Sequence, residues 1–550
     1  MRAKMTDQGL TVHAIAGTYV VLLGFDMAEA DCAGLRGFAI HRTDQTEGEA
    51  YWLTGMKTFE ATDPGPQAGR KFSTRKQPIQ SFAWGDYSAK PDHHYIYRVH
   101  ALKGDPADLQ SVAQVSVNVE TESPEGGNHD IYFNRGSAAS QEYAYRFKNL
   151  PPQNFGDAAF TWLSRGLWEA MVQFIADATG PEHELRLAAY EFNYPPLLDA
   201  LREARDRGVT VRIVYDHRDA VLGAKNEAAA AAARITAECI QRNANPSAIA
   251  HNKFIVRLKN DQAEAVLTGG TNMSIAGILG HSNAVHVVED PVVVGKYAAY
   301  WDVLKDDPEF GVIRPAATVL YDVPADLPPP GTGVVFSPRN SLQALDWYAH
   351  LASKAEAGLF MTFAFGMNAR FQNIYDTSTA RMRFALLDKP TSFTKPAERA
   401  ADIERIRQLR LKPENRFAIG AHLTLNMFDR WLREQLTGLN EHVKYVHTKY
   451  MLIDPLGPDP IVVAGSANFS EASTTKNDEN MLIIRGNKRV AEIYLGEFMR
   501  LYNHYAFREW ASKQPPGSLE PKHLRTDDWW QDYFGDTDRS HQREYFAATQ

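Results

Sequence analysis

The sequence carries His251-Asn252-Lys253 followed by Gly269-Gly270-Thr271-Asn272, and repeats this arrangement nearly two hundred residues later as His447-Thr448-Lys449 followed by Gly465-Ser466-Ala467-Asn468. The His, Lys and Asn stand at the same relative positions in both copies. An internal repeat sets the architecture of a chain. A repeated core would preserve apolar residues, whereas this repeat preserves a base, a cation and an amide.

The spacing within each copy indicates where the side chains point. Residues i and i+2 of a strand project to one face, so the His and Lys of each triplet share a face. Apolar residues follow both triplets, which is typical of buried strands. Two such units facing each other would gather two imidazoles, two ammonium groups and two amides. That set suits a phosphodiester, because the cations and amides bind its oxygens while one His attacks phosphorus and the other protonates the leaving group.

The second copy resembles the signature of the phospholipase D superfamily, which is His-x-Lys, four residues, Asp, then Gly-Ser-x-Asn and later Asn-x-Glu. The matching residues are His447, Lys449, Asp454, Gly465, Ser466, Asn468, Asn477 and Glu479. The first copy is degenerate, with Leu258 in place of the Asp and Gly270 in place of the Ser. Glu479 aligns with Asn283 at equal spacing, or with Ser282 after a shift of one residue. Relatives such as the tyrosyl-DNA phosphodiesterases tolerate loss of the Asp, so an active site is still expected.

The resemblance covers roughly residues 155 to 510 and implies an α/β fold. It implies two pseudo-twofold-related lobes with mixed sheets and a site between them, without a metal or cofactor. The residues expected to be catalytic are His251, Lys253, Asn272, His447, Lys449, Asn468 and Glu479. Those expected to bind phosphate or support the site are Gly270, Thr271, Ser466 and Asp454, although a carboxylate just past a strand also commonly fastens a loop.

The degeneracy suggests different roles for the two histidines. A carboxylate raises the pKa of a neighbouring histidine, whereas an unpaired imidazole near lysines stays neutral. If Glu479 pairs with His447, as the resemblance implies, then His447 is the general acid and His251 the nucleophile that forms a phosphohistidine. The roles could be reversed if Glu479 reaches across the interface.

The rest of the chain divides into recognisable parts. Short alternating strands before residue 123 predict a β-sandwich with a strand that resembles fibronectin type III. A strand, a helix that begins at Pro195 and ends by Gly208, and a second strand predict parallel pairing. The expected division is 1–123 for the β-sandwich, 124–327 for lobe 1 with a helix near 157–178, 328–512 for lobe 2, and 513–550 for an aromatic-rich tail that packs on the body.

Composition sets limits on the function. The chain has 550 residues, a net charge of −8 and only two cysteines, so neither a global basic field nor a disulfide framework is present. No long apolar run or signal-like segment occurs, and a cytoplasmic location is expected. The expected partner is a phosphodiester substrate, with a nucleic acid or nucleotide favoured over the alternative, a phospholipid. An inactive phosphate-binding protein is disfavoured, because both His-x-Lys pairs are present. The oligomeric state is not predicted.

Overall fold

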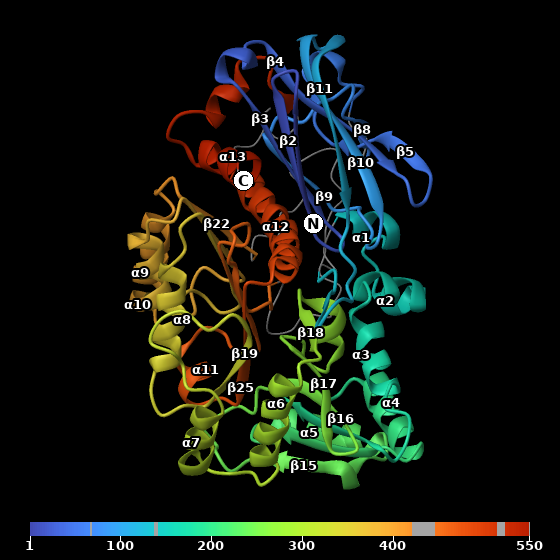
Figure 1. The fold of residues 1–550 in the computed structure, drawn as a ribbon, viewed down its shortest axis with the longest axis vertical. Coiled ribbons are helices and arrows are strands. Elements are labelled where there is room, and N and C mark those ends of the chain that lie inside the picture. The colour runs from blue at the N-terminus through green and yellow to red at the C-terminus, as the bar shows by residue number, and fades with distance from the viewer. Residues whose placement is uncertain (66–68, 137–140, 421–445, 514–522, 549–550) are drawn as a thin grey trace.

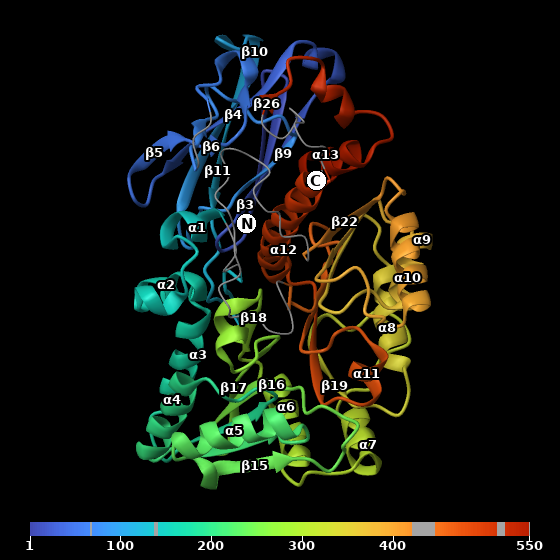
Figure 2. The same cartoon turned by 180° about the vertical axis from the view of Figure 1, so that it is seen from behind.

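The computed structural model describes residues 1–65, 69–136, 141–420, 446–513 and 523–548. Two α/β lobes lie side by side, and a β-rich N-terminal part caps them at one end (Figure 1). The long helix α12, Lys488–Ser512, runs between these parts, as both views show (Figures 1 and 2).

The N-terminal part contains two four-stranded antiparallel sheets, with strand orders β1-β2-β3-β9 and β11-β10-β4-β5. Buried and exposed residues alternate along β11, where Val115, Val117 and Val119 are buried, as expected of a strand with one face on a core. Its strands are β1 Arg2–Asp7, β2 Leu10–Ala16, β3 Val21–Met27, β4 Leu35–Asp44, β5 Glu49–Trp52, β6 Thr54–Gly55, β7 Thr58–Phe59, β8 Phe72–Ser73, β9 Ala83–Asp86, β10 His94–Asp105 and β11 Asp108–Glu120. The antiparallel β region agrees with the sequence, while the resemblance to fibronectin type III stays a prediction.

Each lobe is built on a seven-stranded mixed sheet, and the two sheets have corresponding orders. These are β12-β18-β17-β16-β13-β14-β15 and β19-β25-β24-β23-β20-β21-β22. In each, three neighbouring strands pair in parallel and the others are antiparallel. The two-lobed α/β fold with mixed sheets is therefore confirmed, while the exact domain boundaries stay a prediction.

The elements of lobe 1 are β12 His129–Phe133, α1 Gln141–Phe147, α2 Asp157–Ser164, α3 Leu167–Ala176, β13 His183–Ala189, α4 Pro195–Asp206, β14 Thr210–Asp216, α5 Ala220–Ala232, β15 Cys239–Arg242, β16 Lys253–Lys259, β17 Gln262–Gly269, β18 Ala284–Val288, α6 Pro291–Leu304 and α7 Phe310–Leu320. Those of lobe 2 are β19 Gly331–Ser337, α8 Gln343–Ser353, β20 Gly358–Phe363, α9 Ala369–Thr377, β21 Met382–Leu387, α10 Pro396–Leu409, β22 Asn415–Ile419, β23 Tyr450–Ile453, β24 Ile461–Gly465, α11 Glu471–Thr475 and β25 Glu479–Arg485.

The expected strand-helix-strand unit is present as β13, α4 and β14. Helix α4 begins at Pro195, where the missing N–H is no loss, and ends before Gly208, whose φ of +97° favours glycine. The single helix expected near 157–178 is wrong, because α2 and α3 are separated by Arg165 and Gly166 in left-handed conformations. The buried guanidinium of Arg165 donates to the carbonyl of Phe133 and pairs with a carboxylate of α12, so tertiary contacts stabilise the break.

The aromatic C-terminal tail packs on the N-terminal part, as the sequence predicted. Trp529 is 2% exposed and donates from Nε1 to the carbonyl of Leu35 at 2.8 Å. Strand β26, His523–Leu524, pairs with β7, and helix α13, Asp538–Ala548, follows. Polar residues interrupt even the 25-residue α12, and within the described ranges no helix combines the length and apolar character needed to cross a membrane.

Candidate functional site

The two His-x-Lys triplets lie at equivalent places in the two sheets, at the starts of β16 and β23. Their four basic side chains are all buried, with exposures of 7% for His251, 2% for Lys253, 3% for His447 and 2% for Lys449. Each lysine donates from Nζ to the backbone carbonyl of the histidine in its own triplet. The repeated sequence therefore produces a repeated geometry.

Each histidine is oriented by a side chain from the other lobe. Nδ1 of His251 lies 2.8 Å from Oε2 of Glu479, and Nδ1 of His447 lies 2.9 Å from Oδ1 of Asn283. The expected pairing of Glu479 with His447 is wrong, since Glu479 reaches across the interface. This geometry supports the equal-spacing alignment of Asn283 with Glu479. Each of the two residues is bonded to Nδ1 of the histidine in the opposite lobe.

Backbone contacts between the lobes explain the crossing. The amide of Asp478 donates to the carbonyl of Ile249 at 3.0 Å, and the Asp478 carboxylate pairs with buried Arg242 at 2.7 Å. On the other side, Ser282 and Val446 form an isolated parallel bridge. The residue before each polar partner is thus fixed beside the segment that leads to the opposite histidine, which places the partner against that ring.

The asparagines of the two motifs follow β17 and β24; Asn272 is buried and Asn468 is partly buried. The amide oxygens Oδ1 of Asn272 and Asn468 have no hydrogen-bond partner among the residues that the structure describes. A buried polar atom without a partner is costly, and an amide can turn to present its NH2 group. The same unpaired atom in both lobes points to a ligand between them.

Close packing next to these asparagines explains the small residues of the motifs. A Cβ at Gly465 would lie 2.2 Å from the carbonyl oxygen of Asn480, the residue after Glu479. Ser466 is tied to the same strand, since its Oγ accepts from the Asn480 amide at 3.0 Å. In lobe 1 Thr271 donates from Oγ1 to the carbonyl of Ala284 at 2.9 Å, and the Gly270 amide donates to the same carbonyl. These contacts suit a supporting role.

Asp454 lies at the far end of β23 from the histidine. Its carboxylate accepts hydrogen bonds from the backbone amides of Glu356, Ala357 and Gly358, at distances down to 2.7 Å. Asp454 therefore fastens the loop before β20, and the expectation that it binds or supports the phosphate is corrected to a structural role.

The electrostatics of the site favour an anion. Burial lowers the pKa of His251, against the opposing effect of Glu479. Burial likewise lowers the pKa of Lys253 to about 8. The pKa values of His447 and Lys449 lie well below their ordinary values, because of burial and then of the positive charge of a neighbouring lysine. A bound anion would relieve this repulsion and stabilise the protonated forms.

Two aromatic side chains outside the repeated motifs lie against the histidines, and of these the sequence did not indicate Tyr190 but suggested a lining or packing role for His281. The ring of Tyr190 is 5.1 Å from that of His251, and Nζ of Lys253 is 5.4 Å from the Tyr190 centroid. The ring of His281 is 5.0 Å from that of His447. The position of Tyr190 directly after β13, on the strand that pairs with β16, is the signal that could have revealed it.

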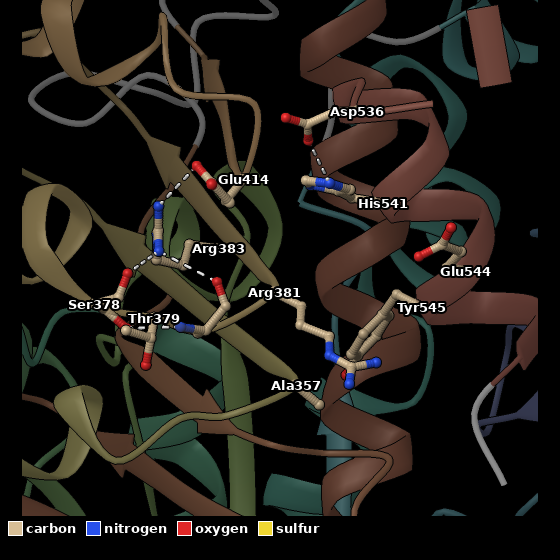
Figure 3. Close-up of a pocket in the computed structure, with 11 residues that line it drawn as sticks. Ala357, Ser378, Thr379, Arg381, Arg383, Glu414, Asp536, His541, Glu544 and Tyr545 are labelled. Atoms are coloured by element: carbon tan, nitrogen blue, oxygen red, sulfur yellow. Dashed lines mark hydrogen bonds and ion pairs between the residues drawn. The ribbon is translucent and has the colours of Figure 1, made fainter. Parts of the chain in front are cut away.

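Other polar clusters lie outside this site. Asp44, Glu47 and His93 of the N-terminal part have ligand atoms within 4.8 Å of one another, but Glu47 already pairs with Lys90. A cavity of about 870 Å3 separates the edge of lobe 2 from α13, and the Arg381 side chain reaches across it beside the ring of Tyr545 (Figure 3). Neither this cluster nor the lining of the cavity contains a residue of the repeated motifs.

Two segments of the chain match a known protein family. The family model described as cardiolipin synthase, PLD-like domain, matches residues 171–304 and 414–502, which include both His-x-Lys motifs. The chain belongs to the phospholipase D superfamily. No curated protein sequence matches this phospholipase D-like chain.

Three solved structures are similar to parts of the fold. Phosphatidylserine synthase of Haemophilus influenzae is 12% identical, with a TM-score of 0.44, over 70% of this chain and 93% of that one. Yeast tyrosyl-DNA phosphodiesterase is 13% identical, with a TM-score of 0.34, over 58% and 88%. Polyphosphate kinase of Porphyromonas gingivalis is 12% identical, with a TM-score of 0.37, over 57% of this chain and only 42% of that one. Likenesses at this level do not select a substrate.

Proposed function

We propose that this chain hydrolyses phosphodiesters through a phosphohistidine intermediate, with both histidines acting on one phosphorus. The observation that carries the proposal is the crossed pairing of the two rings. Because both Nδ1 atoms are bonded to acceptors, each neutral ring keeps its proton there and has a lone pair at Nε2. Neither Nε2 has a hydrogen-bond partner within the described part of the chain. Both reactive nitrogens are thus available to a substrate.

We assign the nucleophile to His251, for a reason different from the one that the sequence suggested. Attack by Nε2 on phosphorus leaves a positive charge on the ring, and this charge persists throughout the intermediate. Glu479, at 2.8 Å from Nδ1, compensates it directly. Asn283 offers His447 only a neutral acceptor. When a bound phosphate anion stabilises the protonated ring, the lowered pKa of His447 makes this ring a strong proton donor from Nε2 to the leaving oxygen. His447 then serves as base for the water that hydrolyses the adduct.

The two lysines and two asparagines are assigned to the non-bridging oxygens. Lys253 and Lys449 carry the required positive charge, and the amides of Asn272 and Asn468 supply neutral donors. No step in this scheme requires a metal ion, so hydrolysis is proposed to be metal-independent.

We favour a nucleic acid or nucleotide diester as the substrate class. The equivalent strands β13 and β20 each lead into an aromatic residue with a lysine over its ring. These pairs are Tyr190 with Lys253 at 5.4 Å, and Phe365 with Lys389 at 5.8 Å. Phe365 is 39% exposed just past β20. An aromatic face beside a cation suits a base and its phosphate.

The proposal is tested with labelled single- and double-stranded DNA and RNA, bis-p-nitrophenyl phosphate, and phosphatidylcholine vesicles. His251→Ala and His447→Ala should each reduce turnover by orders of magnitude, and the double variant should be little worse, because the two act in one displacement. His94→Ala, on an exposed histidine of the N-terminal part, is the matched control and should retain wild-type rates. Wild-type rates in either site variant would contradict the mechanism, and turnover of the vesicles alone would overturn the substrate class.

The assignment of the nucleophile has its own test. In His447→Ala, a substrate with a good leaving group should still react, but the adduct would lack the base for its hydrolysis. Acid-labile, base-stable label should therefore accumulate on the peptide that contains His251. Label on the His447 peptide in the complementary His251→Ala variant would reverse the roles.

A further inference from the structure

A second pair of residues repeats in the two lobes, apart from the motifs. Strand β14 ends with Asp216, and Asp388 directly follows β21. The registers make these positions equivalent, because Thr210 pairs with Glu184 on β13 just as Met382 pairs with Gly358 on β20. Both aspartates are 0% exposed. A buried carboxylate is rare without a specific partner, so its occurrence at the same place twice calls for a physical reason.

Each aspartate holds the segment that carries a histidine. Oδ1 of Asp216 accepts from the backbone amide of Ala250, the residue before His251, at 2.9 Å. Oδ1 of Asp388 accepts from the amide of Val446, the residue before His447, at 3.0 Å. The same contact is made to the residue before each triplet, in the segments that lead into β16 and β23.

Each aspartate also acts electrostatically on the lysine of its own triplet, Asp216 on Lys253 and Asp388 on Lys449. These lysines are buried beside each other and beside two histidines, so charge repulsion and desolvation both oppose their protonation. The charged and titratable groups around them are His251, His447, Glu191, Glu479, Asp216 and Asp388.

We infer that Asp216 and Asp388 are a duplicated pair of positioning residues, which hold the two histidine-bearing loops and supply the negative charge that keeps Lys253 and Lys449 protonated for a phosphate. This inference rests on the proposed function, in which the lysines bind the non-bridging oxygens. Substitution by asparagine separates the hydrogen bond of each aspartate from its charge. The asparagine side chain can still accept from the backbone amide, but it carries no charge.

The test compares Asp216→Asn and Asp388→Asn with wild type, using the pH dependence of kcat/KM on bis-p-nitrophenyl phosphate. The negative charge of Asp216 raises the pKa of Lys253, so its removal lowers that pKa, and activity should be lost at lower pH than in wild type. We expect the alkaline limb, near pH 8 for Lys253, to move by roughly one unit to lower pH in Asp216→Asn. Asp216→Ala should lose turnover at every pH, because the loop contact is lost as well.

Asp306→Asn, an exposed position with the same change of charge, is the control and should leave the limb unchanged. A purely structural role predicts that both Asn variants keep the wild-type limb, and that result would overturn the inference. Thermal unfolding verifies that each variant is folded. If one of the two Asn variants does not fold, the equivalent substitution in the other lobe provides the test.

Calorimetric binding of sulfate, whose charge is constant over this pH range, separates the inference from the proposed function. If wild type binds sulfate but hydrolyses no diester, the proposed activity fails. The role of the aspartates is still supported if the Asn variants lose their affinity for sulfate at a lower pH than wild type. If binding shows no such shift, the inference fails even where hydrolysis is observed. If wild type neither binds sulfate nor turns over, both fail.

Discussion

Glu479→Gln isolates the contribution of the carboxylate that is bonded to His251. The glutamine carbonyl can still accept the Nδ1 hydrogen of His251, so the ring stays oriented and only the charge is lost. For charges about 4 Å apart at an effective dielectric of about 20, the interaction is about 4 kcal/mol. The neutral hydrogen bond that remains contributes about 1 kcal/mol. The net loss of about 3 kcal/mol corresponds to a reduction in rate of roughly 150-fold.

The loss should appear in the formation of the adduct, because the positive ring exists in the intermediate and not in the ground state. Single-turnover quench-flow with a good leaving group measures this step directly. Glu471→Gln, at an exposed position on α11 of the same lobe, has the same change of charge and should stay near wild type. A reduction of less than about fivefold in Glu479→Gln would refute the stabilisation of the intermediate by this carboxylate.

Three further outcomes are expected. Asn283→Asp should raise the pKa of His447 and move the alkaline limb of kcat to higher pH if His447 is the acid, whereas a shift of the acidic limb would identify it as the nucleophile. The variant should also unfold at lower temperature, because the Asn283 amide loses its bond to the Gly277 carbonyl. Turnover should survive EDTA, and activity abolished by chelation and restored by a divalent ion would contradict the mechanism. Trp529→Ala should lower the free energy of unfolding by about 3–5 kcal/mol in a urea titration; a change below 1 kcal/mol would mean that the tail adds little to the fold.

The sequence predicted the architecture well, because its strongest signals are local. Pro195 and Gly208 mark the two ends of a helix, and apolar runs follow both triplets. The aromatic residues of the tail, such as Trp529, predicted that it packs on a core. The break between α2 and α3 was missed, since it depends on a buried ion pair between Arg165 and Glu497, more than three hundred residues away.

For the site, the repeated motifs predicted the participating side chains but not which side chains are bonded to each other. Glu479 stands near His447 in the chain, so a pairing within one copy was the simplest reading. The partner is set by how the lobes face each other, which is visible only in contacts such as that of Asp478 with Ile249. Asp454 was ambiguous for a similar reason, because the amides of residues 356–358 that it binds come from a distant loop. Asp216 belongs to no sequence motif, and only the register of β14 on β13 shows that it is equivalent to Asp388.

The crossed partners have a consequence for the history of the protein. In a homodimer of identical lobes, one gene position would supply the partner of both rings, and the two histidines would have identical surroundings before a substrate binds. Fusion of the lobes into one chain removes that constraint, since Glu479 and Asn283 occupy separate codons and are free to diverge. Covalent linkage thus allows symmetry to be broken: the halves keep a common scaffold while one ring acquires a charged neighbour and the other a neutral one. A duplicated site in a single polypeptide is free to specialise in a way that an assembly of equal subunits is not.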